Sequence, residues 1–207
     1  IATKVILGKS LKEQGIDMIY PEEKKRWYVK APAFSFAKLN GMDAYLSPEM
    51  KSTGEAIGYD DKLPRAMYKA LIASGVKMQN YGTVVVTLAD EDKEEALPLI
   101  KRFYDMGFNI EATVGTGEFL KAHGIRTRIR RKLSENSTEI LEAIRAGYVS
   151  YVINTRAILS GIHYEDGLAI RRTAIENNVT MFTSLDTVRV LLDVLEEITI
   201  VVSTITE

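Results

Sequence analysis

Residues 76–207 alternate short apolar runs with amphipathic stretches. Between the runs, apolar positions recur at helical spacing, as at Ala96, Ile100 and Phe103, and Gly107 then supplies the left-handed conformation that ends a helix. Another helix is predicted to begin at Asn136, with Glu139 three residues on in a capping-box arrangement, and to end at Gly147. Strands that alternate with helices at this spacing predict an α/β fold with a mostly parallel, Rossmann-like sheet and helices on both faces. The predicted strands are Thr83–Leu88, Phe108–Thr113, Ile125–Ile129, Tyr148–Ile153, Val179–Thr183 and Thr199–Val202.

Residues 1–75 lack this repetition. Such a segment buries too little apolar surface to offset the chain entropy of ordering it. We therefore place a domain boundary near Gly75 and expect residues 1–75 to be an irregular α+β appendage to the α/β domain of residues 76–207. The elements predicted in the appendage are a helical opening at Ile1–Gln14, a strand at Trp27–Phe36, a turn at Asn40–Gly41 and a helix at Leu63–Ser74.

Charge and composition exclude several classes of function. The 27 basic and 28 acidic side chains give a net charge of -1, so no overall field attracts nucleic acid or an anionic membrane, and neither partner is expected. The absence of cysteine excludes disulfides, thiolate metal sites and cysteine nucleophiles, and two histidines cannot form a His-rich metal cluster. The apolar runs are too short to span a bilayer, and no signal peptide opens the chain, so we expect a cytoplasmic protein. Because the first residue is Ile1 rather than Met, we expect a piece of a longer chain.

Candidate ligand-binding residues follow the predicted strands, because parallel sheets bind ligands beyond the carboxyl ends of their strands. After the first strand comes an acidic turn that ends in Lys93; it is either a solvated first helical turn or part of a site. After the second strand, Thr113, Gly115 and Thr116 precede a short helix predicted to begin at Glu118. Glycines, hydroxyls and a helix start together suit a phosphate, although a bare turn is the alternative.

The next two strand ends add further donors. A basic run ends at Lys132, either as a solvated cluster or as part of the site, and Asn154, Thr155 and Arg156 follow the fourth strand. Four donor-rich strand ends predict a small phosphorylated ligand.

No catalytic constellation accompanies these donors. His123 is expected to cap a short helix, and His163 lies in a polar loop. Glu165 and Asp166 are expected to begin a helix rather than to form a carboxylate dyad. The local pattern therefore favours binding over reaction.

The sequence resembles the C-terminal part of the large subunit of carbamoyl phosphate synthetase over essentially its whole length. The resemblance rests on Gly8–Leu11, Glu13–Gly15 and the octad Pro48–Glu55, which resembles the segment trailing the second ATP-grasp unit. In the second region it rests on Asp92–Glu94, Thr113–Thr116, Lys132, Ile153–Thr155 and Ile170–Arg172.

This resemblance implies a methylglyoxal-synthase-like regulatory domain at 76–207 and the tail of the second ATP-grasp region at 1–75. The parent enzyme makes carbamoyl phosphate from bicarbonate, two ATP with Mg²⁺ or Mn²⁺, and ammonia from a small glutamine amidotransferase subunit. Its catalytic residues would precede Ile1, so this piece would hold no cofactor and catalyse nothing alone. The family's effector-nucleotide pocket falls on Lys93, Thr113, Thr116, Lys132, Asn154 and Thr155.

Two departures from the family pattern narrow the class of effector that we expect. Positions that hold a glutamate and a tyrosine in an ornithine-activated form carry Ala31 and Met181 here. Without that carboxylate an ammonium ligand loses its charge partner, so we expect control by UMP, with phosphoribosyl pyrophosphate or IMP as other effectors.

Two other classes remain open. One is a methylglyoxal synthase, a lyase acting on dihydroxyacetone phosphate; its catalytic aspartate would follow the fourth strand, where this chain has Asn154–Ala157. The other is a self-associating module that binds no nucleotide.

Overall fold

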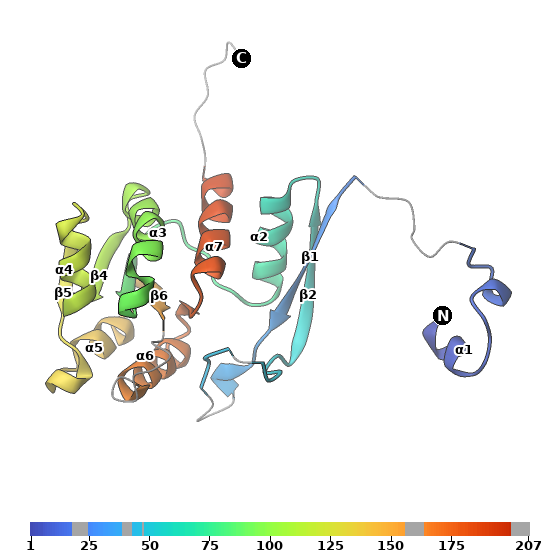
Figure 1. The fold of residues 1–207 in the computed structure, drawn as a ribbon, viewed down its shortest axis with the longest axis horizontal. Coiled ribbons are helices and arrows are strands. Elements are labelled where there is room, and N and C mark those ends of the chain that lie inside the picture. Colours follow the sequence, from blue (N-terminus) through green and yellow to red (C-terminus); the bar gives the residue numbers. More distant parts are fainter. Residues whose placement is uncertain (18–24, 39–42, 47, 156–163, 200–207) are drawn as a thin grey trace, which may run out of the picture.

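The computed structural model describes residues 1–17, 25–38, 43–46, 48–155 and 164–199. Its centre is a parallel sheet of five strands in the order β5-β4-β3-β6-β7 (Figure 1). The parallel sheet is as the sequence predicts, and five of the six expected strands form it. The strands are β3 (Thr83–Thr87), β4 (Asn109–Thr113), β5 (Thr127–Arg130), β6 (Val149–Asn154) and β7 (Thr180–Phe182).

Helices cover both faces of this sheet. Val84 and Val86 point into one apolar core and Val85 into the other, because successive side chains on a strand alternate between faces. The first core packs α3 (Lys93–Asp105), α4 (Val114–Ala122) and α7 (Leu185–Ile198) against the sheet. The second packs α5 (Glu139–Arg145) and α6 (Tyr164–Glu176). The expected three-layer α/β fold is therefore confirmed.

An aromatic cluster fills the first core. Phe103 meets Phe108 edge to face at 5.3 Å between ring centroids, and Tyr151 lies beside both rings. The Tyr151 hydroxyl accepts a hydrogen bond from the Gln79 N–H and donates one to the Gln79 carbonyl, both 2.7 Å long. Burial raises the pKa of Tyr151 to about 12 despite this hydrogen bond, so the phenol stays neutral. The Tyr151 hydroxyl therefore connects Gln79, which lies shortly before β3, to the middle of β6.

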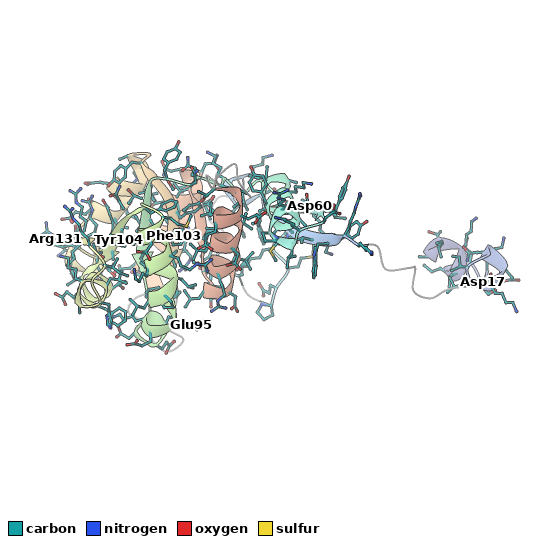
Figure 2. The ribbon with its side chains drawn as sticks, turned by 90° about the horizontal axis from the view of Figure 1, so that it is seen from above. Asp17, Asp60, Glu95, Phe103, Tyr104 and Arg131 are labelled. Carbon is teal, nitrogen blue, oxygen red and sulfur yellow. The ribbon has the colours of Figure 1, made fainter. Side chains whose placement is uncertain are left out.

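The first region contributes a small second sheet. Strands β1 (Trp27–Ala33) and β2 (Gly54–Asp60) pair antiparallel, and α2 (Leu63–Ala73) packs against them. Helix α2 also contacts α7, so it stands between the hairpin and the α/β domain (Figure 1). In Figure 2, Asp60 at the end of β2 and Arg131 beyond β5 lie on opposite sides of α7. The domain boundary near Gly75 stays a prediction; Gly75, at φ 92°, follows the end of α2.

The remaining elements are short. They are α1 (Ala2–Ile6) and the 3-10 helices η1 (Lys12–Gln14), η2 (Phe36–Lys38), η3 (Asp90–Asp92) and η4 (Leu133–Glu135). In the described ranges, none of the helices combines the length and apolar character needed to cross a membrane.

Three sequence expectations need correction. Helix α4 begins at Val114, four residues before the expected Glu118, so the glycine-containing turn is itself the first turn of a helix. Asn136 is not a helix N-cap; it adopts the left-handed conformation after η4, and α5 follows Thr138. Thr199 closes α7 instead of opening a strand, and residues 200–202 lie outside the described ranges, as does the Asn40–Gly41 turn.

Close contact between the hairpin and α2 generates a stability prediction. Gly58 of β2 faces α2 so closely that a Cβ there would overlap the Ala66 carbonyl oxygen and the Ala70 nitrogen. We expect Gly58→Ala to lower the free energy of unfolding by about 3 kcal/mol, the upper end for overpacking, measured by urea denaturation. The control is Gly54→Ala on the same strand, whose Cβ would meet only the Ala33 Cβ at 3.8 Å. Equal losses in both variants would contradict the packing interpretation.

Candidate functional site

The strand order places a topological switch point beside β3. From β3 the chain crosses to β4 and β5 on one side, whereas β6 and β7 lie on the other side. In open parallel sheets of this kind, ligands bind beyond the carboxyl ends of the strands at the switch point. The residues after β3, β4 and β6 therefore define the candidate site.

Lys93 and Gly115 meet at this edge. Lys93 begins α3, and its ammonium lies 3.7 Å from the position that a Cβ on Gly115 would take. Gly115 lies exposed in the first turn of α4, where backbone N–H groups have no partners within the helix. The Lys93 ammonium also contacts the Asp90 carboxylate at 2.6 Å and lies 6.0 Å from the Phe119 ring centroid. A cation and a helix N-terminus thus face the same space.

The two threonines of the β4 turn are buried. The Thr113 hydroxyl donates to the Thr116 hydroxyl at 3.3 Å, and the Thr116 oxygen accepts a 3.2 Å hydrogen bond from the Leu88 N–H. They connect the start of α4 to the end of β3. Their first role in this structure is therefore to hold the loops of the site in place.

Thr155 makes the corresponding connection from β6. Its N–H donates to the Thr87 carbonyl at 3.1 Å, and its hydroxyl oxygen accepts the Ala89 N–H at 2.9 Å. The hydroxyl proton of Thr155, which is half-buried, still has to find an acceptor. Thr155 therefore closes the switch point and can still donate to a ligand.

Asn154 is held from two sides by protein groups. Its amide nitrogen donates to the Thr87 hydroxyl at 2.5 Å, and its amide oxygen accepts a 2.8 Å hydrogen bond from Arg171 of α6. All three side chains are buried. The expected direct contact between Asn154 and a ligand is untested, and in this structure its amide serves an internal network.

Arg171 is the residue that the sequence analysis did not place in the site. Its guanidinium donates through Nε and Nη2 to both carboxylate oxygens of Asp43, at 2.7 Å each, and only 2% of the side chain is exposed. One signal in the sequence could have pointed to Arg171: it lies between Ile170 and Ala174, two apolar positions on the buried face of one helix. A buried arginine needs an anionic partner, so this position indicates an ion pair. The partner lies 128 residues away along the chain.

The surroundings of Asp43 favour its ionised form. Burial opposes ionisation, but hydrogen bonds from Arg171 and from the Tyr45 N–H, with the charges of Arg171 and Lys51, outweigh it and hold the pKa of Asp43 below its ordinary value. The Lys51 ammonium donates to the carbonyls of Asp43 and Tyr45, at 3.1 and 2.6 Å. Lys51 belongs to the octad that the sequence analysis singled out.

Two arginines at the end of β5, Arg130 and Arg131, are paired with acidic neighbours. Arg130 donates two hydrogen bonds to the buried carboxylate of Glu111, which raise the pKa of the Arg130 guanidinium, and Arg131 pairs with Glu139. Lys132 follows β5, two strands from β3, and its backbone N–H donates to Glu135. Among the described residues, no contact joins Lys132 to Lys93.

The other polar candidates have structural roles or lie outside the description. His123 ends α4, with its Nδ1 2.9 Å from the Phe119 carbonyl oxygen, as expected of a capping residue. Glu165 and Asp166 lie in the first turn of α6, as expected. Arg156 and His163 lie outside the described residues. Within the described ranges, no cluster of three acidic or histidine side chains could hold a metal ion.

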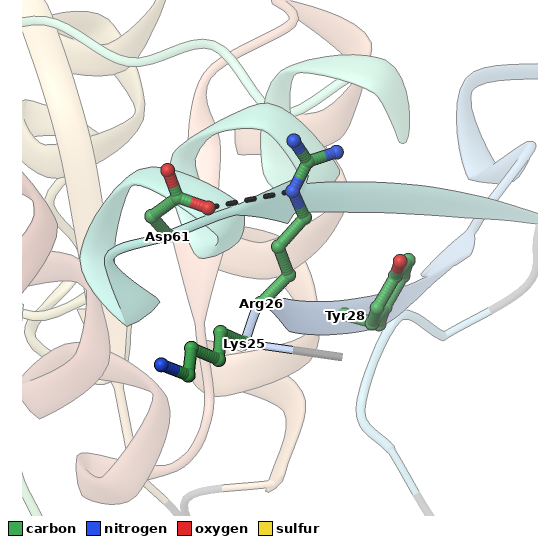
Figure 3. A pocket seen from close by; sticks show the side chains of 4 residues that line it. All are labelled: Lys25, Arg26, Tyr28 and Asp61. Atoms are coloured by element: carbon green, nitrogen blue, oxygen red, sulfur yellow. Dashed lines mark ion pairs between the residues drawn. The ribbon is translucent and has the colours of Figure 1, made fainter. Parts of the chain in front are cut away.

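A separate cleft opens on the hairpin, far along the chain from these strand ends (Figure 3). It has a volume of about 570 Å³ and is lined by Lys25, Arg26, Tyr28 and Asp61. Arg26 pairs with Asp61 at 3.4 Å, and both side chains are more than half exposed. Such exposed pairs hold their geometry weakly, so the cleft lacks the preformed donors of the sheet edge.

Comparisons with known proteins found a matching family model and similar solved structures. Residues 95–183, from within α3 to just beyond β7, match the family model of the MGS-like domain. The crystal structure of methylglyoxal synthase from Elizabethkingia anophelis NUHP1 aligns at 17% identity and a TM-score of 0.49, over 56% of this chain and 79% of that one. The crystal structure of ForH aligns at 19% identity and 0.45, over 56% and 80%. The family match supports an MGS-like domain at residues 95–183.

The buried pair predicts a specific acid dependence. Because the pKa of Asp43 is lowered in the folded state, its stabilising effect is complete above the unfolded value of about 3.8 and is lost as the pH falls through the lower folded value. We expect Asp43→Asn to be destabilised relative to the wild type by a constant amount near neutral pH. That difference should shrink below pH about 4, measured by urea denaturation at each pH. A difference independent of pH would contradict the assigned ionisation of Asp43.

Proposed function

We propose that this chain, which contains an MGS-like domain, is the effector-binding regulatory part of a carbamoyl phosphate synthetase large subunit. Its ligand in this proposal is a phosphorylated nucleotide of the UMP type. The observation that carries the proposal is the Lys93 ammonium beside Gly115 in the first turn of α4, at the carboxyl edge of a parallel sheet. A cation and free helical N–H groups facing one space favour a dianionic phosphate.

Asp90 already places an anion on Lys93, which supports this assignment. A carboxylate oxygen of Asp90 lies 2.6 Å from the Lys93 ammonium, although 94% of the Asp90 side chain is exposed. An exposed carboxylate can turn into water at little cost, whereas Lys93 is mostly buried and stays in position. A phosphate would therefore replace Asp90 on Lys93, and the hydroxyl of Thr155 would be a further donor.

The parent enzyme in this proposal makes carbamoyl phosphate from bicarbonate, ammonia and two ATP with Mg²⁺ or Mn²⁺, in the cytoplasm. A small glutamine amidotransferase subunit supplies the ammonia. The present chain contributes effector binding, with no cofactor or catalytic residue of its own. Phosphoribosyl pyrophosphate and IMP are the competing effectors, because each presents a phosphate to the same donors.

The alternative is a methylglyoxal synthase, which the family match also allows. Dihydroxyacetone phosphate would bring its own phosphate to the same edge, but proton abstraction from it needs a base. The residues described at the end of β6, Asn154 and Thr155, are an amide and a hydroxyl. The nearby carboxylates of Asp43 and Asp90 are paired with Arg171 and Lys93. Binding without reaction is therefore the better supported function.

Calorimetric titration tests the phosphate site. Lys93→Met should weaken binding of UMP by roughly 1.5–3 kcal/mol, the range for losing a hydrogen bond to a charged group. Lys101→Met removes the same charge from an exposed position of the same helix, where Lys101 pairs with Asp105, and should leave the affinity unchanged. Asp90→Asn should tighten binding, because the competing carboxylate is gone.

Equal affinity of the wild type and the Lys93→Met variant would remove Lys93 from the site. Titration with IMP and phosphoribosyl pyrophosphate alongside UMP ranks the effectors. If the wild type binds none of the three, the proposed function is wrong.

An enzymatic assay separates the two functions. With dihydroxyacetone phosphate as substrate, the wild-type chain should form methylglyoxal no faster than the Lys93→Met variant, because no unpaired base is described at the site. Methylglyoxal formation that depends on Lys93 would establish the lyase and overturn the regulatory assignment.

A further inference from the structure

A hydrogen-bonded chain connects the first region of the molecule to the candidate site. It runs from Asp43 to Arg171, from Arg171 to Asn154, and from Asn154 to the Thr87 hydroxyl at the end of β3. The outer carboxylate belongs to residues 43–46, here called the Asp43 segment, which lies between β1 and β2 in sequence. Arg171 thus contacts both the Asp43 segment and β6.

Arg171 sets the orientation of the Asn154 amide. A guanidinium only donates, so the Asn154 amide must turn its oxygen towards Arg171 and its nitrogen towards the Thr87 hydroxyl. The carbonyl of the same Thr87 accepts the N–H of Thr155, and the Thr155 hydroxyl accepts the N–H of Ala89. The side-chain bonds that begin at the buried ion pair therefore end on Thr87, the residue whose backbone holds the loop after β6.

The packing leaves this arrangement little freedom. A Cβ on Gly167 of α6 would come within 2.9 Å of Arg171 Nη1 and 3.5 Å of Asn154 Oδ1. The guanidinium also lies over the Tyr45 ring, at 5.7 Å from Cζ to the centroid. Removing Asp43 would leave a cation that is 2% exposed without an anion, so the guanidinium would have to move, and Asn154 with it.

We propose that Arg171 is a positioning residue that couples docking of the Asp43 segment to the shape of the strand ends at β3 and β6. The inference rests on the proposed function for its ligand, an anion bound beside Lys93. Docking of the Asp43 segment and anion binding then favour one another, and the linkage is reciprocal.

Three variants that change charge differently test the proposal. Asp43→Asn removes one negative charge and Arg171→Met removes one positive charge, whereas Gly167→Ala changes no charge and displaces the guanidinium. In the ligand-free chain, all three should speed amide hydrogen exchange at Ala89 and Thr155, measured residue by residue by NMR. Arg172→Met, at the exposed neighbouring position, is the control and should leave both rates unchanged.

Titration with UMP is the second readout. All three variants should weaken its affinity by about five-fold or more, in the same direction despite their different charges. A purely electrostatic effect would instead tighten binding in Asp43→Asn, weaken it in Arg171→Met and spare Gly167→Ala, and that result overturns the proposal. In the wild type, saturating UMP should slow exchange of the Tyr45 N–H, which donates to Asp43 at 3.1 Å.

The two failures can be told apart. If the wild type does not bind UMP, the proposed function is wrong, and the exchange rates at Ala89 and Thr155 still decide the coupling. If those rates are unchanged in all three variants, Arg171 only attaches the Asp43 segment and the coupling is refuted. Gly167→Ala keeps every polar group and adds a residue of higher helix propensity, so it gives a result even if the other variants unfold.

Discussion

Strand β3 is the constraint around which the molecule is built. All five of its residues are buried, it pairs with β4 on one side and β6 on the other, and helices cover both of its faces. Other strands and helices therefore surround β3 along its whole length. The carboxyl end of β3, which leads through Leu88 to Ala89 and Asp90, opens towards the loops after β4 and β6, because parallel strands bring their carboxyl ends to the same edge.

A buried ion pair at that edge carries a cost as well as a benefit. Transfer of a guanidinium and a carboxylate out of water costs several kcal/mol for each ion, and only good geometry offsets it. Arg171 and Asp43 achieve this with a two-bond fork, and the third arm of the fork reaches Asn154. The pair is therefore better explained by the arrangement it specifies than by the stability it adds.

Sequence reasoning found what local patterns encode. The five strands and their alternation with helices follow from β-branched runs such as 83–88. Lys93 and Gly115 were selected as candidates because such sheets bind ligands at strand ends, and the structure places these two residues beside each other. The start of α4 was misplaced because glycines in 115–117 read as a turn, although a helix tolerates them in its first turn. Arg171 and Asp43 were missed as partners because no local signal links residues 128 positions apart.

Strand β6 is joined to the first region at Asn154, through Arg171 and Asp43. The packing of α2 on α7, with the ion pairs of Lys62 and Arg65 to Glu197, supplies a second attachment on the opposite face of the sheet from α6. A body held at two separated places keeps its orientation, whereas a body held at one place can turn about it. Release of Asp43 alone would therefore let β1, β2 and α2 turn about α7 without leaving the domain.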